Sequence, residues 1–154
     1  AWAYAGSEDA IRQALVERYP RESFKLATKN AAWINCKSRE DAIAQFDISL
    51  KRTQAGYFDF YLLHNLGESR TKYFDEYRMW DWIQEKQAEG TIKHIGFSFH
   101  STPEELEELL QAHPKMEFVQ LQINYADWEN PAVQSRACYE IARKYKKHIR
   151  KEGS

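Results

Sequence analysis

Cysteine is scarce in this 154-residue chain, which contains only Cys36 and Cys138. Two cysteines so far apart provide neither a disulfide framework nor the ligand spacing of a zinc site, so we expect free thiols and no bound metal. The sequence also lacks any apolar run near the roughly 20 residues that span a bilayer, and no signal-peptide pattern opens it. We therefore expect a cytoplasmic location without a membrane partner.

An excess of charge of one sign is also absent. The chain has 22 Lys and Arg residues against 23 Asp and Glu residues, for a formal net charge of −1. Such a balance creates no global field that would attract nucleic acid, so small molecules are the expected partners. Apolar residues are plentiful, because 43% of the chain is hydrophobic and 14% is aromatic. This composition and length suit one domain with a buried core.

Strand-like and helix-like segments alternate along the chain. The strand-like segments are apolar and span Phe24–Lys29, Phe58–His64, Ile92–Phe99 and Phe118–Ile123. Helical segments lie before, between and after them. Units of about thirty residues suit right-handed crossovers between parallel strands. The sequence therefore predicts an α/β fold in which four parallel strands alternate with five helices.

Several residues predict where these helices begin and end. The first helix starts after Ser7, and a second starts at Ser38, whose hydroxyl can cap it, and ends at Gly56. The run Thr102-Pro103-Glu104-Glu105 combines a capping hydroxyl, a proline at the first helical position and a glutamate three residues after the cap. It is a strong helix start.

A long aromatic helix is predicted between the second and third strands. Phe74, Tyr77, Trp80 and Ile83 fall roughly on one side of it, and Gly90 ends it. These aromatic side chains are expected to belong to the core.

Two strands each deliver one ionisable side chain at the carboxyl end. Lys29 ends the first strand and His64 ends the second, while Tyr4 lies just before the first helix. Active sites of parallel α/β proteins lie at this end of the strands. A proton-handling site is thus one interpretation. The alternatives are an ordinary aromatic residue at a helix entrance for Tyr4 and a hydrogen-bonded core imidazole for His64.

Five segments resemble the aldo-keto reductases in sequence and spacing. They are Ala1-Trp2-Ala3-Tyr4-Ala5-Gly6-Ser7-Glu8, Ala27-Thr28-Lys29, Tyr61-Leu62-Leu63-His64, Ile95-Gly96-Phe97-Ser98 and Phe118-Val119-Gln120-Leu121-Gln122. They occur in the family's order and cover nearly the whole chain, to about Tyr145.

This resemblance implies a (β/α)8 TIM barrel of which the chain supplies strands three to six. A complete barrel takes about 250 residues. We expect residues 1–146 to form this partial barrel and 147–154 to form a basic polar tail. The family's aspartate that pairs with the lysine would precede Ala1. Four strands cannot close, so the open edges favour self-association, and we expect the isolated chain to be inactive.

The resemblance also implies a function and roles for five residues. The function is NADPH-dependent reduction of aldehydes or ketones to alcohols. Tyr4 would be the proton donor, Lys29 would stabilise its anion, and His64 would donate a hydrogen bond to the oxygen of the small carbonyl substrate. Ser98 and Gln120 would hold the nicotinamide carboxamide. Many relatives have asparagine directly after that serine, where this chain has phenylalanine.

Two other functions remain open at this point. Lys29 could form a Schiff base with a carbonyl substrate in a lyase or aldolase, since a barrel lysine suits that chemistry. The chain could also be a noncatalytic, reductase-like subunit that binds a nucleotide or another protein.

Overall fold

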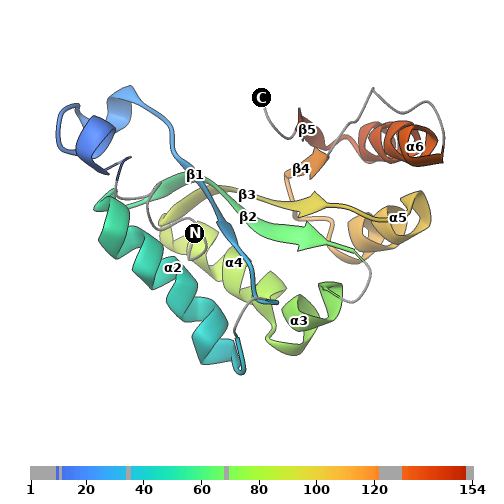
Figure 1. Ribbon diagram of the computed structural model, residues 1–154, viewed down its shortest axis with the longest axis horizontal. Coiled ribbons are helices and arrows are strands. Elements are labelled where there is room, and N and C mark those ends of the chain that lie inside the picture. Colours follow the sequence, from blue (N-terminus) through green and yellow to red (C-terminus); the bar gives the residue numbers. More distant parts are fainter. Residues whose placement is uncertain (1–9, 11, 34–35, 68–69, 122–129, 152–154) are drawn as a thin grey trace.

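Five parallel strands form one sheet in the order in which they follow each other along the chain (Figure 1). The structure is a computed structural model that describes residues 10, 12–33, 36–67, 70–121 and 130–151. The strands are β1 (Ala27–Asn30), β2 (Phe58–Leu66), β3 (Ile92–Phe99), β4 (Phe118–Leu121) and β5 (His148–Lys151). The predicted α/β fold with parallel strands is confirmed, with one strand more than predicted.

Helices connect the strands as crossovers. They are α2 (Arg39–Thr53), α3 (Thr71–Glu76), α4 (Met79–Glu89), α5 (Pro103–Ala112) and α6 (Asn130–Lys144). In Figure 1, α2, α3 and α4 lie on one side of β1, β2 and β3, while α5 and α6 lie beside the later strands. Within the described residues, no helix is both long and apolar enough to cross a lipid bilayer.

The extra strand, β5, lies in the segment predicted to be a basic polar tail. It pairs in parallel with β4, so that Phe118 lies opposite His148. Ile149 packs against the core, and the Lys147 ammonium donates to the carbonyls of Pro114 and Met116 at 2.7 and 2.6 Å. Backbone pairing does not require apolar side chains. The basic composition of this segment therefore gave no sign of a strand.

The predicted starts of two helices are confirmed. The Ser38 hydroxyl accepts from the backbone N–H of Asp41 at 3.3 Å and caps α2. The Thr102 hydroxyl accepts from the N–H of Glu105 at 3.4 Å and caps α5. The end of α2 differs from the prediction, because Gln54 adopts a left-handed conformation with φ of 53° two residues before the predicted glycine.

The predicted long aromatic helix is wrong, because the segment forms two helices, α3 and α4. Arg78 separates them and has a left-handed φ of 52°. The Arg39 guanidinium donates to the Tyr77 carbonyl at 3.0 Å, and the Trp80 indole donates to the Asp75 carboxylate at 2.8 Å. These contacts hold the break in place. Gly90 ends α4, as predicted.

Two other predicted boundaries reach residues outside the described ranges. The start of the first helix at Ser7 lies there, and residues 12–16 form a π-helical turn, Arg12–Val16. The predicted end of the fourth strand, Ile123, also lies there, and β4 is described only to Leu121.

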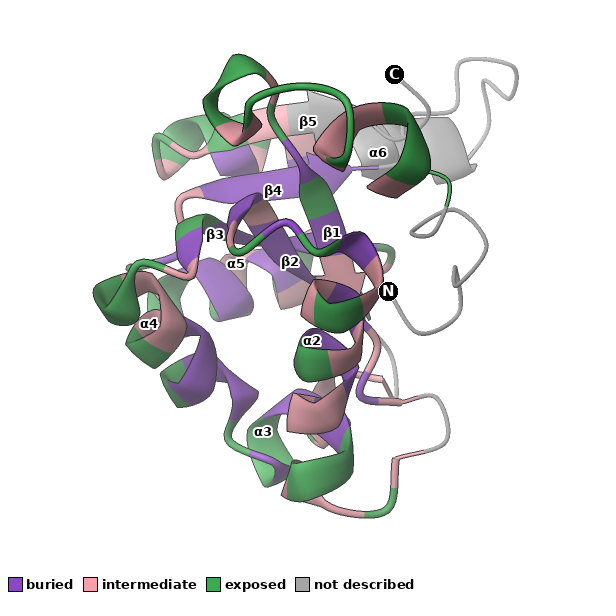
Figure 2. Ribbon diagram, turned by 90° about the vertical axis from the view of Figure 1, so that its left-hand side faces the viewer, coloured by how far each residue is buried: buried purple, intermediate pink, exposed green. Residues whose placement is uncertain are grey.

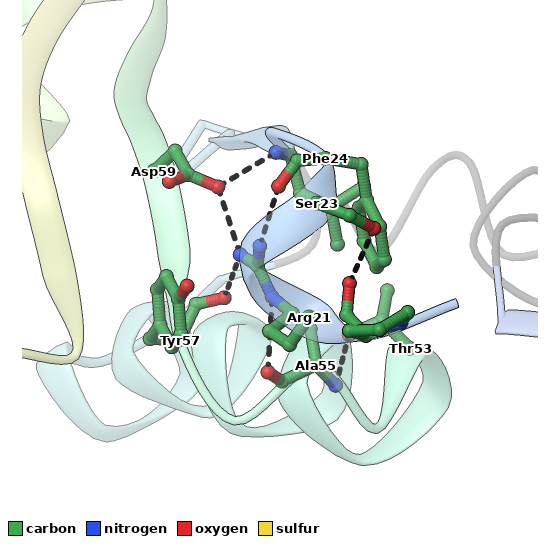
Figure 3. A network of polar contacts seen from close by, with 9 residues as sticks. Arg21, Ser23, Phe24, Thr53, Ala55, Tyr57 and Asp59 are labelled. Carbon is green, nitrogen blue, oxygen red and sulfur yellow. Dashed lines mark hydrogen bonds and ion pairs between the residues drawn. The ribbon is translucent and has the colours of Figure 1, made fainter. Parts of the chain in front are cut away.

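The first strand begins later than predicted because an arginine holds the segment before it. The turn Arg21–Ser23 places the Arg21 guanidinium against the start of β2, where it donates to the Asp59 carboxylate at 2.9 Å (Figure 3). The same carboxylate accepts from the N–H of Leu26 at 2.9 Å. The guanidinium also donates to three carbonyls, those of Phe24 (2.9 Å), Ala55 (3.2 Å) and Tyr57 (2.7 Å). We call these contacts the Arg21 clamp.

The core lies between the helices and one face of the sheet. Buried segments of the strands and helices face each other there (Figure 2). On β2, Tyr61 is fully buried and packs edge-on against Phe46 and Trp82, with ring centroids 5.2 and 5.8 Å away. Side chains alternate between the faces of a strand. The neighbouring residues Phe60, Leu62 and His64 therefore lie on the opposite face, which we call the inner face.

Candidate active site

His64 and Ser98 meet on the inner face at the carboxyl ends of β2 and β3. Leu63 pairs with Phe97 in the parallel register, so the residue that follows each of them lies at the same level. Nδ1 of His64 lies 3.1 Å from Oγ of Ser98, within hydrogen-bond distance. Ser98 is only 4% exposed. Two residues that lie 34 positions apart in the sequence thus form one polar pair, in which Ser98 is buried and His64 is half-buried.

Trp33 fixes the backbone of His64. Its indole Nε1 donates to the His64 carbonyl at 2.9 Å, and its ring stacks near the imidazole with centroids 6.0 Å apart. The register between β2 and β3 shifts directly after this point, between Leu63 and Leu66. A bulge of this kind re-aims side chains beside functional sites. Sequence reasoning missed Trp33, although a tryptophan four residues beyond Lys29 was a usable signal.

Burial and positive charge keep the His64 imidazole neutral. Burial is the larger cause, and the ammonium of Lys29 and the guanidinium of Arg70 add to it, so the pKa of His64 falls from 6.5 to about 4. Lys29 pairs with Leu62 in the register of β1 and β2, and it therefore lies on the same inner face as His64. The two predicted residues therefore lie close enough for the charge of Lys29 to lower the pKa of His64.

Gln120 on β4 lies next to the pair of His64 and Ser98, and we call these three residues the polar row. It pairs with Ser98 in the register of β3 and β4 and is 8% exposed. A hydroxyl and an amide side by side can together donate to and accept from a planar carboxamide. This donor set fits the nicotinamide end of a nicotinamide dinucleotide.

An apolar layer lies beneath the polar row. Gly96 on β3 pairs with Phe118 on β4, and a Cβ atom on Gly96 would lie only 2.6 Å from the Phe118 ring. Glycine is therefore required for this close approach. Phe60 packs edge-on against the same ring, with centroids 5.8 Å apart. Phe60, Gly96 and Phe118 thus form an apolar floor next to the polar row.

The structure thus places four of the five predicted site residues at one end of the sheet. They are Lys29, His64, Ser98 and Gln120. The fifth, Tyr4, lies outside the described residues. The contact between His64 and Ser98 was not anticipated from the sequence.

A family comparison decides where this arrangement belongs. The model of the aldo/keto reductase family matches residues 1–150 of the chain. The chain belongs to the aldo/keto reductase family. Among curated proteins, an uncharacterised oxidoreductase of Schizosaccharomyces pombe is 31% identical to it over 77 residues, which are 50% of this chain and 26% of that protein.

Solved structures of aldo/keto reductases share the fold. A reductase from Brucella melitensis superposes with a TM-score of 0.71 at 24% identity, covering 92% of this chain and 51% of that one. A Klebsiella pneumoniae reductase, solved with NADP and acetate, gives a TM-score of 0.68 at 22% identity, covering 94% and 47%. The chain therefore spans about half the length of these reductases.

Proposed function

We propose that this chain carries the carbonyl-binding and proton-handling part of an NADPH-dependent reductase that converts aldehydes or ketones to alcohols. The row formed by His64, Ser98 and Gln120 carries the proposal, because it combines a neutral imidazole with a hydroxyl and an amide that could hold a carboxamide. Family membership supports it independently. The free thiols of Cys36 and Cys138 agree with the reducing cytoplasm in which we place the protein.

Ser98 and Gln120 would hold the carboxamide of the cofactor. Their register pairing puts the hydroxyl and the amide on the same face of the sheet, two and three strands away from Lys29. NADPH, when bound, supplies the hydride that reduces the carbonyl carbon. Holding the carboxamide at two points would fix which face of the ring is presented to the substrate.

His64 would bind the substrate oxygen and Tyr4 would protonate it. A neutral imidazole has one N–H to donate, and this bond orients the carbonyl and stabilises the negative charge that develops on its oxygen. The phenol of Tyr4 would give its proton to that oxygen. The ammonium of Lys29 would stabilise the phenolate that remains, as a nearby positive charge favours the charged form of an acid.

The proposal is tested with the protein in its full natural length. NADPH consumption is followed with a panel of small aldehydes and ketones, and the alcohol product is identified. We expect turnover in the wild type and a decrease of at least about a hundredfold in Tyr4→Phe and His64→Asn, because general acid catalysis is worth that much. Unchanged turnover in Tyr4→Phe, or no carbonyl reduction by the wild type, would contradict the proposal.

Two other outcomes of the same experiment point to other functions. NADPH binding without turnover would indicate a noncatalytic, reductase-like subunit. Covalent trapping of a carbonyl substrate on Lys29 by borohydride would indicate Schiff-base chemistry. For the isolated 154-residue chain we expect no steady NADPH consumption, and sustained carbonyl-dependent consumption would contradict that expectation.

A further inference from the structure

The hydrogen bond between His64 and Ser98 has two possible directions. A neutral imidazole carries one proton, on either Nδ1 or Nε2. If the Ser98 hydroxyl donates to Nδ1, the proton of the ring lies on Nε2. If Nδ1 donates to Oγ of Ser98, then Nε2 has no proton and can only accept. The 3.1 Å distance suits both directions.

The chemistry of the site distinguishes the two directions. Nδ1 is engaged by Ser98, so Nε2 is the nitrogen that remains for a substrate. A carbonyl oxygen only accepts hydrogen bonds, and it therefore needs a proton on Nε2. The Trp33 indole donates to the backbone carbonyl of His64. It therefore does not determine which ring nitrogen carries the proton.

We propose that Ser98 is a positioning residue that donates its hydroxyl proton to Nδ1 of His64 and thereby places the imidazole proton on Nε2. The inference rests on the proposed function, in which His64 donates to a carbonyl oxygen. It adds a second task to the residue expected to hold the carboxamide. The two tasks are compatible, because a serine hydroxyl has one proton to donate and two lone pairs that accept.

The two tasks also couple the cofactor to the substrate. A carboxamide N–H that donates to Oγ of Ser98 leaves the hydroxyl proton directed toward His64. Hydrogen bonds in such a chain polarise one another, and burial strengthens the effect. Ser98 is 4% exposed, so water competes little for its hydroxyl. Cofactor binding is therefore expected to strengthen the preference of His64 for the Nε2 proton.

The tautomer is measured by nitrogen NMR on the 15N-labelled 154-residue chain without cofactor at neutral pH. Protonated and unprotonated ring nitrogens have well-separated chemical shifts, and His64→Asn assigns the signals. We expect a protonated Nε2 and an unprotonated Nδ1 in the wild type. In Ser98→Ala both signals move toward averaged values, while Ser98→Thr, which keeps the hydroxyl, retains the wild-type shifts. Ser101→Ala serves as the matched control, because it removes a hydroxyl three residues further along the chain.

A protonated Nδ1 in the wild type would overturn the inference, as would unchanged nitrogen shifts in Ser98→Ala. The wild-type measurement decides the question even if the alanine variant does not fold. This readout needs no turnover, so the inference and the proposed function fail separately.

Kinetics of the full-length protein provide a second readout. We expect Ser98→Ala to lower kcat about tenfold, the equivalent of one hydrogen bond, and Ser98→Thr to restore it. A change confined to the KM for NADPH would show that Ser98 only holds the cofactor, and it would count against a positioning role.

Discussion

Arg21 and Asp59 form an ion pair at the end of the sheet opposite His64, with Nη2 and Oδ2 2.9 Å apart. Both side chains are nearly buried, with 13% and 11% of their surfaces exposed. The pair belongs to the Arg21 clamp, which joins the segment before β1 to the start of β2 (Figure 3). It therefore fixes the register that places Lys29 beside Leu62.

Removal of the arginine is expected to destabilise the fold. Arg21→Ala leaves the Asp59 carboxylate nearly buried without its partner, and such a change costs about 3 kcal/mol of the free energy of unfolding. Arg21→Lys should cost less, because one ammonium keeps the charge but cannot reach all four acceptors. Urea unfolding measures both. The exposed Arg18→Ala is the control, and equal stability of Arg21→Ala and Arg18→Ala would contradict the role of the clamp.

Acid is expected to weaken the same pair. Burial raises the pKa of Asp59, but hydrogen bonds from Leu26 and Arg21 outweigh it and hold the pKa below its usual value. Asp59 therefore stabilises the fold above the unfolded pKa of about 3.9, and this contribution is lost as the pH falls through the lower folded value. Asp59→Asn should be less stable than the wild type at neutral pH, and the difference should shrink in acid. Stability curves that stay parallel down to low pH would refute this.

Gly96 is expected to tolerate no side chain. A Cβ atom at this position would lie 2.5 Å from the Phe118 carbonyl oxygen and 2.6 Å from its ring. Gly96→Ala should lower stability by about 1–3 kcal/mol, as overpacking does. Adding Phe118→Leu relieves only the contact with the ring and should not restore the wild-type melting temperature. A melting temperature of Gly96→Ala equal to the wild type would show that the floor is looser than described.

His64 is expected to titrate far below an ordinary histidine. Its folded pKa of about 4 lies below the unfolded value of 6.5, so the unfolded chain takes up the proton first. The wild type should therefore lose stability relative to His64→Asn as the pH falls from about 6.5 to 4. In NMR titrations, Lys29→Met should raise the pKa of His64 but leave it below 6.5, because burial is the larger cause. A midpoint near 6.5 in the wild type would rule out this environment.

Glycine at position 78 is expected to stabilise the protein. Arg78 is exposed and has a φ of 52°, a left-handed conformation that is costly for residues with a Cβ atom. Arg78→Gly should raise stability by about 0.5–1 kcal/mol. The matched variant Arg78→Val, whose branched side chain disfavours this conformation, should lower stability. Thermal unfolding compares the two, and the same shift in both variants would mean that backbone strain is not the cause.

The sequence predicted those features that depend on local chemistry. Ser38 and Thr102 predict where their helices begin, because a capping hydroxyl acts within one turn. The break at Arg78 could not be predicted, since neither glycine nor proline marks it and distant contacts hold it. β5 was not predicted for a similar reason, because its pairing with β4 depends on an available sheet edge rather than on its own basic residues.

The candidate site also has a part that the sequence predicted and a part that only the fold shows. The resemblance supplied Lys29, His64, Ser98 and Gln120 by motif, and β1–β4 place all four at one end of the sheet. The bond between His64 and Ser98 requires the register of β2 and β3, which no single motif contains. The support from Trp33 comes from a residue beyond the strand, and only the folded chain shows which carbonyl it contacts.

Each member of the polar row is carried by a different strand, while the crossover helices run along the far side of the sheet (Figure 1). Substitutions in the helices, or a change in helix length, therefore leave the spacing of the row unchanged as long as the backbone pairing of the strands is kept. The chemistry of this fold and its outer shell are free to diverge at separate rates.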